Sequence, residues 1–410
     1  MAAARQNSVL QPPQKEEAVM KKAVHFGAGK IGRGFIAELL FDSGYEIIFA
    51  DVVQEMVEQI NQTHSYRLFR IEQDYEEKLI TNVSALSSIH QQSEIIEAIL
   101  EAEVVTTSVM ATNLPKIAPL LARALRRRCE SGKEKLTVMA CENAIMGTDI
   151  LKKAMADTGL ITEEMLDAAG VYPNTAVDRI VFDGIHGGKE GIEIGEAYEL
   201  AIERNKLIDP SKKPIAGAEY VDNLEMLLQR KIYMINCGHA LCGYIGQQHG
   251  YEIVQDALRD PIIQAEVTAA VMESAAALER KYGYTHEELE RYMNIMMLKR
   301  FLTPGLSDPI ARVSREPIRK ISPNDRIMGP ACQCEKYGLE NRHLLKGAAY
   351  ALRFHNEADE QAVKLQAFIK EQGVEAAITK YTGAPTDSRI FRVILEEYNR
   401  LDEEKICSKQ

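Results

Sequence analysis

Three polar side chains lie close together in an otherwise largely apolar segment, residues 230–240 (RKIYMINCGHA). They are Lys231, Asn236 and His239. At about 100° per residue, a helix would place Asn236 about 140° and His239 about 80° from Lys231, so we expect all three on one side. A lysine there could serve as a general base, and an asparagine amide could donate a hydrogen bond to a developing alkoxide. The structural alternative is a lysine that snorkels from the helix edge beside two satisfied polar groups of the core.

A glycine-rich segment, HFGAGKIGRGF at residues 25–35, contains the pattern GxGxxG, formed by Gly27, Gly29 and Gly32. It follows a short apolar run and precedes a helical pattern. In that setting the first glycine permits a tight turn, the second lets the backbone approach a pyrophosphate, and the third lets helix and strand pack closely. The predicted cofactor-binding residues are Phe26, Gly27, Ala28, Gly29, Lys30, Ile31, Gly32, Arg33, Gly34 and Asp51.

Asp51 ends a second apolar run, 19 residues after Gly32. A carboxylate at that place accepts hydrogen bonds from the ribose hydroxyls of NAD and repels the 2′-phosphate of NADP, so we expect NAD. An alcohol that loses hydride must also lose its hydroxyl proton, and a base, a metal or both must assist. The chain has no CxxC pair and no Cys/His spacing typical of zinc, so we predict no metal. A lysine beside a positively charged nicotinamide ring, away from water, would release its proton readily enough to act as the base.

The N-terminal half alternates strand-like and helix-like segments. Apolar runs at residues 23–26, 46–50, 104–109 and 136–140 predict strands, whereas long helical patterns dominate beyond about residue 220. We therefore predict an α/β protein with an N-terminal Rossmann-type doubly wound domain at residues 20–205 and a mostly α-helical substrate and catalytic domain at residues 206–410. Residues 1–19 are polar and are predicted to form a flexible tail.

Composition excludes several classes of protein. The 410 residues carry a net charge of −11, which argues against a general nucleic-acid or membrane-surface binder, because those partners select for clustered positive charge. Seven cysteines are too few for a disulfide scaffold, and no targeting segment is evident, so we expect reduced thiols and a cytoplasmic location. We predict a small-molecule substrate, no nucleic-acid or membrane partner, and a monomer or homodimer.

The spacing of Lys231, Asn236 and His239 resembles the Lys-x4-Asn-x2-His signature of the polyol-specific long-chain dehydrogenases, the mannitol dehydrogenase family. Other similar segments are HFGAGxIGRGF, CENAIMGT (141–148), AVDRI (176–180) and RxSREPxRKISPNDR (312–326), so the resemblance covers nearly the whole chain from Met20 to about residue 400. It implies that Lys231 is the general acid and base, and that Asn143 and Asn236 flank the reacting oxygen as donors. It also implies that His239 orients the lysine or binds a substrate hydroxyl.

Asn143 has independent support, because it follows the fourth predicted strand, at the sheet edge where ligands bind in open α/β folds. A structural role as the cap of the next helix does not exclude this one. Asp178 and Arg179, in the AVDRI segment, are expected to form a structural ion pair near the site.

Within the family, the chain is most similar to the branch that acts on mannitol 1-phosphate, although Lys30 stands where that branch usually has asparagine. The resemblance implies an NAD-dependent, metal-independent interconversion of D-mannitol 1-phosphate and D-fructose 6-phosphate. One alternative is a related dehydrogenase of an unphosphorylated polyol or a hexonate. Another is a dinucleotide-binding sensor, which would not need Lys231, Asn143 and Asn236 together.

A sugar phosphate needs cationic ligands, and one segment, residues 312–326, is basic in this acidic chain. Its charged side chains are Arg312, Arg315, Glu316, Arg319, Lys320, Asp325 and Arg326. Arginine suits a phosphate because its planar fork makes two parallel charge-assisted hydrogen bonds. We predict that Arg312, Arg315 and Lys320 bind the substrate phosphate; Arg315 and Lys320 are favoured, since Arg312 is equally suited to sugar hydroxyls.

Overall fold

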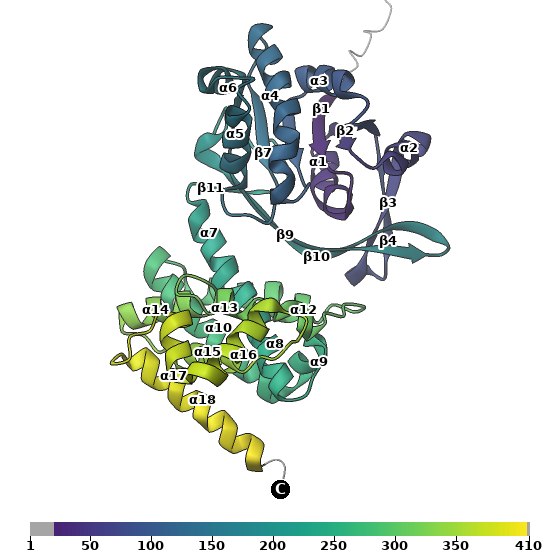
Figure 1. Cartoon of the computed structure of the whole chain (residues 1–410). Coiled ribbons are helices and arrows are strands. Elements are labelled where there is room, and N and C mark those ends of the chain that lie inside the picture. The colour runs from purple at the N-terminus through teal and green to yellow at the C-terminus, as the bar shows by residue number, and fades with distance from the viewer. Residues whose placement is uncertain (1–19, 408–410) are drawn as a thin grey trace, which may run out of the picture.

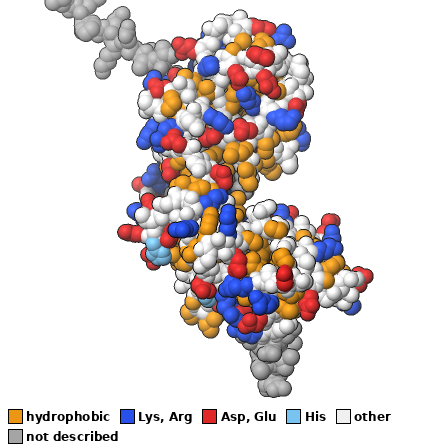
Figure 2. Space-filling model, turned by 90° about the vertical axis from the view of Figure 1, so that its left-hand side faces the viewer, with side chains coloured by type: hydrophobic (Ala, Val, Ile, Leu, Met, Phe, Trp, Pro, Cys, Tyr) orange, Lys and Arg blue, Asp and Glu red, His pale blue; other side chains and the backbone are white. Residues whose placement is uncertain are grey.

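The computed structural model of this chain describes residues 20–407, with side chains up to Leu401. Two lobes are joined by α7 (Leu224–Arg230), which descends from the upper to the lower lobe in Figure 1. A turned view shows a notch between the lobes (Figure 2). The predicted tail, residues 1–19, lies outside the described residues.

A six-stranded sheet in which all strands run parallel forms the centre of the upper lobe. In spatial order its strands are β5 (Val83–Ser87), β2 (Tyr45–Asp51), β1 (Lys21–Phe26), β6 (Val104–Thr107), β7 (Leu136–Ala140) and β8 (Gly170–Val171). The four apolar runs of the sequence form the central strands β2, β1, β6 and β7. The chain order reverses between β1 and β6, and ligands bind outside the carboxyl ends of the strands at such a switch point.

Helices cover both faces of this sheet. One face packs against α3 (Gln92–Glu101), α4 (Leu114–Glu130), α5 (Gly147–Asp157) and α6 (Glu163–Ala169). The other packs against α1 (Ala37–Asp42) and α2 (Gln54–Thr63). The predicted doubly wound arrangement is therefore confirmed.

A second, mixed sheet borders the upper lobe where it faces the lower lobe (Figure 1). Its strands are β11 (Glu219–Val221), β10 (Lys189–Glu203), β3 (Ser65–Arg70) and β4 (Glu76–Thr81), with β9 (Thr175–His186) paired to β10 in antiparallel orientation. Because β11 pairs with β10, we propose that the upper domain extends to Val221, beyond the boundary at residues 205 and 206 expected from the sequence.

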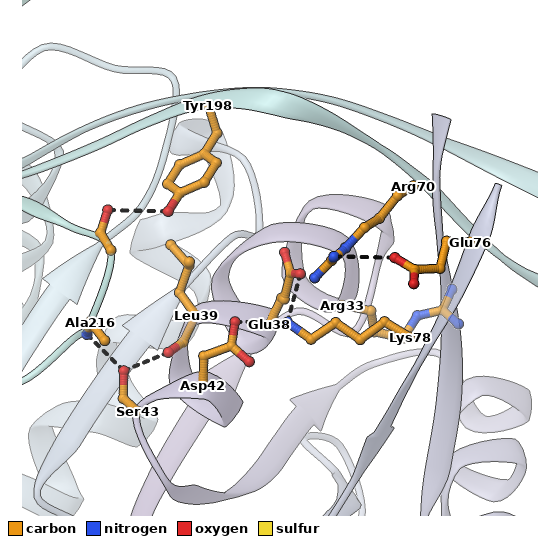
Figure 3. Close-up of polar contacts among 12 residues, drawn as sticks. Arg33, Glu38, Leu39, Asp42, Ser43, Arg70, Glu76, Lys78, Tyr198 and Ala216 are labelled. Atoms are coloured by element: carbon orange, nitrogen blue, oxygen red, sulfur yellow. Dashed lines mark hydrogen bonds and ion pairs between the residues drawn. The ribbon is translucent and has the colours of Figure 1, made fainter. Parts of the chain in front are cut away.

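Polar contacts fasten α1 to this second sheet (Figure 3). Lys78 of β4 donates to Glu38 at 2.9 Å and to Asp42 at 2.7 Å, both on α1. The Ser43 hydroxyl after α1 accepts a hydrogen bond from the backbone N–H of Ala216, in the segment before β11. The helix that follows the glycine motif is thus held to the strands that face the lower lobe.

The lower lobe is a helical domain built around α8 (Cys237–Gln248), which is buried along most of its length. The longest neighbouring helix, α10 (Pro261–Tyr282), starts at a proline after the capping side chain of Asp260 and ends at Gly283, whose φ of +77° suits glycine. The other α-helices are α9 (Val254–Arg259), α11 (His286–Met293), α12 (Ile310–Val313), α13 (Pro317–Lys320), α14 (Met328–Tyr337), α15 (Arg342–Leu352), α16 (Glu360–Gln372), α17 (Val374–Ala377) and α18 (Arg389–Cys407). Within residues 20–407, no helix has the length and apolar character needed to cross a membrane.

Candidate active site

Lys231 lies at the interface between the lobes and begins a π-helical turn, η5 (Lys231–Asn236), between α7 and α8. The residue is only 8% exposed. Its Nζ donates a hydrogen bond to the Val177 carbonyl of β9 at 2.7 Å and to the Asn143 amide oxygen at 3.4 Å. The structure thus brings together a lysine of the lower lobe and an asparagine of the upper lobe, two of the four predicted catalytic side chains.

Two cavities meet at this lysine. The first, which we call the cofactor-side cavity, has a volume of about 340 Å³ and extends toward the glycine motif; its walls include Ile31, Phe35, Ser108, Met110 and Arg179. The second, the substrate-side cavity, has a volume of about 400 Å³; its walls include Ile145, Asn236, Arg319, Asn324, Asp325 and Arg326. Lys231 and Asn143 line both cavities, so groups held in the two would meet at these side chains.

Asn236 lines the substrate-side cavity with Lys231, but His239 lines neither cavity. The His239 ring lies over Phe301, with 4.4 Å between ring centroids, and its Nε2 is 3.5 Å from Asp308. Burial lowers the pKa of His239, and the nearby Asp308 offsets only part of that effect. We expected Lys231, Asn236 and His239 on one side of a regular α-helix. The i→i+5 hydrogen bonds of η5 change the angle between successive residues, so His239 does not share that side.

Asp178 and Arg179 of β9 do not pair with each other, so the expected ion pair is wrong. Asp178 binds Arg300 at 2.7 Å and lies 3.9 Å from the Lys231 Nζ, whereas Arg179 binds Glu38 of α1. Successive side chains of a strand point to opposite faces. Burial alone would raise the pKa of Asp178, but the charges of Lys231 and Arg300 outweigh it and hold that pKa below its ordinary value. An ionised carboxylate therefore faces Lys231.

The glycine motif has the backbone geometry that its spacing predicts. Gly27 has a φ of +100°, which residues with a Cβ rarely adopt. A Cβ on Gly32 would lie 2.0 Å from the Gly27 carbonyl oxygen, so only glycine fits there. A Cβ on Gly29 would meet no atom within 4 Å, which leaves the backbone at that position open to a ligand.

Asp51, at the end of β2, accepts hydrogen bonds from the backbone N–H groups of Ala28 and Val53. A carboxylate has about four acceptor positions, so it can still accept two ribose hydroxyls.

Apolar side chains lie exposed at the carboxyl ends of neighbouring strands: Val52 after β2 is 63% exposed, and Met110 after β6 is 68% exposed. Such surfaces suit the flat rings of a dinucleotide, so the residues present fit this cofactor.

The other residues predicted to bind the cofactor have different surroundings. Ile31 lines the cofactor-side cavity, whereas Phe26 is buried in the core and Gly34 packs against the second sheet. These two can contribute only through their backbone or through packing.

The two charged residues of the glycine motif both have protein partners. Lys30 forms an ion pair with Asp183 of β9 at 2.8 Å. Arg33 donates from Nε to the carbonyl of Ala28, and its guanidinium lies 6.0 Å from the ring centre of Tyr66. Arg33 therefore stabilises the glycine loop through its hydrogen bond to the Ala28 carbonyl.

His25, two residues before the motif, is a supporting residue that the sequence reasoning missed. Its ring nitrogens hydrogen-bond Thr106 at 2.6 Å and Ser108 at 2.9 Å, and burial lowers its pKa to about 3. A neutral imidazole therefore links β1 to the end of β6 beneath the glycine motif. A polar residue within a short apolar strand was the only signal for it.

Glu142 was also missed, although it precedes Asn143. Its buried carboxylate accepts hydrogen bonds from the Thr107 hydroxyl and from the backbone N–H groups of Val109 and Met110. It thereby holds a turn in which Met110 has a φ of +73°. The next helix, α5, begins only at Gly147, so the structural alternative for Asn143 as its cap is not met.

Two sequence-family models match this chain. The mannitol dehydrogenase Rossmann domain matches residues 21–211, and the mannitol dehydrogenase C-terminal domain matches residues 223–401. The chain belongs to the mannitol dehydrogenase family. It is therefore a dehydrogenase with a dinucleotide-binding Rossmann domain and a helical C-terminal domain, as the resemblance implied.

Relatives in the mannitol dehydrogenase family match nearly the whole chain. The mannitol-1-phosphate 5-dehydrogenase of Geobacillus stearothermophilus is 38% identical over 381 residues, which are 92% of this chain and 99% of that protein. The mannitol-1-phosphate 5-dehydrogenase of Arthrobacter sp. (strain FB24) is 37% identical over 373 residues, 91% of this chain and 96% of that protein.

Two solved structures share the fold at lower sequence identity. A D-sorbitol dehydrogenase in substrate-free form superposes with a TM-score of 0.77 at 17% identity, covering 93% of each chain. The mannitol 2-dehydrogenase of Pseudomonas fluorescens, in a ternary complex with NAD and D-mannitol, gives a TM-score of 0.67 at 17% identity and covers 95% of this chain and 93% of that one.

The three residues predicted to bind the substrate phosphate, Arg312, Arg315 and Lys320, lie outside the substrate-side cavity of this member of the mannitol dehydrogenase family. Arg312 pairs with Asp308, and Arg315 lines a separate cavity near α16. Lys320 is buried and donates to the carbonyl of Val313. The structure therefore does not bring Arg312, Arg315 and Lys320 to Lys231.

The burial of Lys320 is expected to make the stability of this protein depend on pH. Burial lowers its pKa to about 7, aided by nearby arginines, whereas in the unfolded chain it lies near 10.5. Between these values the unfolded chain binds more protons than the folded one, so the free energy of unfolding should rise with pH by up to about 1.4 kcal/mol per unit. Denaturant titrations from pH 7 to 9 should show this rise in the wild type and lose it in Lys320→Met.

The exposed Lys370 of α16 supplies the control, because Lys370→Met should keep the wild-type pH dependence. The unfavourable burial of a charged lysine is fully present below pH 7, so Lys320→Met should also be more stable than the wild type there. If the free energy of unfolding changed with pH in the same way in the wild type and in Lys320→Met, the lowered pKa of Lys320 would not be the cause of the rise.

Proposed function

We propose that this protein interconverts D-mannitol 1-phosphate and D-fructose 6-phosphate with NAD, without a metal ion, and that Lys231 is the general acid and base. One observation carries the chemistry: the Lys231 Nζ lies 3.4 Å from the Asn143 amide oxygen, where the two cavities meet. The substrate is supported by the mannitol-1-phosphate 5-dehydrogenases that are up to 38% identical over more than nine-tenths of the chain.

NAD bound at the glycine motif would supply the hydride acceptor for the alcohol carbon. In this oxidation, a neutral Lys231 takes the hydroxyl proton, and the Val177 carbonyl orients its Nζ. The oxygen of Asn143 faces Nζ, so its NH₂ group remains free to donate to the alkoxide, together with Asn236. In ketone reduction, Lys231 returns the proton to the oxygen. Among the described residues, no group of three His, Cys, Asp or Glu side chains is placed to hold a metal ion.

Turnover assays that follow NADH test the substrate. Fructose 6-phosphate and fructose at equal concentration should differ strongly in rate, with the phosphate ester preferred. Equal rates would favour the alternative, a dehydrogenase of unphosphorylated polyols, and a preference for a keto-hexonate would favour a sugar-acid dehydrogenase.

NAD should be preferred to NADP because of Asp51. Removing one negative charge beside the adenosine ribose, in Asp51→Ser, should shift the NADH-to-NADPH ratio of kcat/KM toward NADPH by about tenfold or more. The ratio is measured at saturating substrate. Asp157→Ser, on the exposed end of α5, is a control that should leave it unchanged. Wild-type preference for NADPH would rule out this role for Asp51.

We also propose a cytoplasmic location and a monomer or homodimer. The described cysteines are free thiols, which a reducing compartment maintains.

A further inference from the structure

Two arginines that the sequence reasoning did not select lie in the wall of the substrate-side cavity. Arg319 belongs to α13 and Arg326 follows it, and both line the cavity that also contains Lys231, Asn143 and Asn236. Positive side chains are therefore available in the same cavity as the proposed base.

Arg326 is held in place but is not saturated by its neighbours. It is 17% exposed, and its Nε donates to Asp325 at 2.7 Å. In the part of the chain that the structure describes, no partner is recorded for its two terminal nitrogens. A guanidinium with both of these nitrogens available can make parallel charge-assisted hydrogen bonds to an anion with several oxygens.

Asp325 holds the two arginines close together. Its carboxylate binds Arg326 through one oxygen and Arg319 through the other, the latter at 3.1 Å. Burial alone would raise the pKa of Asp325, but hydrogen bonds from Arg326 outweigh it and keep that pKa below its ordinary value. Arg319 is also paired with Glu316 at 2.7 Å, so the two arginines are balanced by two carboxylates. The capacity to bind an anion therefore lies mainly in the terminal nitrogens of Arg326, which point to neither carboxylate.

Glu142, the other carboxylate in the wall of this cavity, is already engaged by hydrogen-bond donors of the protein. Glu142 already accepts hydrogen bonds from Thr107, Val109 and Met110. The other polar groups, Asn143, Asn236 and Asn324, are neutral amides that suit the hydroxyls of an extended polyol. The cavity therefore has a cationic part, a hydroxyl-binding part and the proposed base.

We propose that Arg326, together with Arg319, binds the phosphate of the substrate and so selects the phosphate ester over the free sugar. This assignment rests on the proposed function, and it replaces Arg315 and Lys320 as the phosphate ligands. A carboxylate at the end of a sugar acid shares the chemistry that arginine recognises, so the experiment must distinguish the two anions.

Steady-state kinetics with NADH should be measured for fructose 6-phosphate, fructose and fructuronate. In the wild type, fructose 6-phosphate should have the highest kcat/KM. Arg326→Gln should raise KM for fructose 6-phosphate about 10- to 100-fold and change kcat/KM for fructose far less, because fructose has no anionic group at this position. Arg315→Gln, in the same segment but lining a separate cavity, is the matched control and should retain the wild-type preference.

The outcomes separate the two proposals. A wild type that does not favour fructose 6-phosphate contradicts the proposed function, and a wild type that favours fructuronate assigns the arginines to a carboxylate. If the wild type favours fructose 6-phosphate but Arg326→Gln weakens all three substrates equally, or Arg315→Gln has the same effect, the arginine assignment is overturned. Should Arg326→Gln fail to fold by thermal denaturation, Arg319→Gln carries the same test, since Arg319 is 45% exposed.

Discussion

Lys231→Ala is expected to lower kcat by about 10²-fold or more while leaving the dissociation constant for NADH nearly unchanged. The lysine Nζ lies where the two cavities meet, and among the described residues no other amine lines either cavity. Without it, the site loses the proposed group that takes the hydroxyl proton in oxidation and returns it in reduction. Steady-state assays with fructose 6-phosphate give kcat, and the fluorescence of bound NADH gives the dissociation constant.

A lysine elsewhere in the lower lobe provides the control. Lys299 is exposed at the end of a π-helical turn, η6 (Asn294–Lys299), and Lys299→Ala should be indistinguishable from the wild type. Metal chelators should not change the rate of the wild type. A Lys231→Ala enzyme with kcat within a few-fold of wild type, or inhibition by EDTA that zinc reverses, would refute the proposed mechanism.

Gly32→Ala is expected to abolish measurable NADH binding and to destabilise the upper domain. The added Cβ would lie 2.0 Å from the Gly27 carbonyl oxygen and 2.9 Å from the His25 ring. Backbone at that distance cannot move aside cheaply, so the turn must open and the packing of the helix against β1 must loosen. Fluorescence titration with NADH and thermal denaturation measure the two effects.

Gly29→Ala separates cofactor binding from stability. Its Cβ would meet no protein atom within 4 Å, so the variant should unfold at nearly the wild-type temperature. It should nevertheless bind NADH more weakly, because the methyl group would occupy the space where the pyrophosphate approaches the backbone. Normal NADH affinity in Gly29→Ala would show that the dinucleotide does not pass over this residue.

The local features of the fold could be predicted from the sequence. Buried parallel strands appear as continuous apolar runs, and all four predicted runs became central strands. The glycine spacing specified a turn that needs glycine at two positions: Gly27 has a positive φ, and a Cβ on Gly32 would collide with the Gly27 carbonyl oxygen. The proximity of Asn143 and Lys231 followed from the family resemblance and from the place of Asn143 after a strand.

Features that depend on exact geometry could not be predicted. The π-helical turn at Lys231 has no simple sequence pattern, and it determines that Asn236 joins the cavity while His239 faces Asp308. The basic segment 312–326 contains short helices, and its neighbouring positive side chains point in different directions. Arg319 lines the substrate-side cavity, whereas Lys320 is buried. Charge alone could not distinguish these two neighbours.

The opposite directions of Asp178 and Arg179 restrict how this chain can vary in length. Shifting β9 by one residue would turn Asp178 toward Glu38 and Arg179 toward Lys231 and Arg300, so that like charges would meet on both faces. A single-residue insertion or deletion inside β9 should therefore be far more harmful than most point substitutions there. Natural differences in length should instead occur in the exposed turn between β9 and β10, where Gly187 and Gly188 lie outside any packed face.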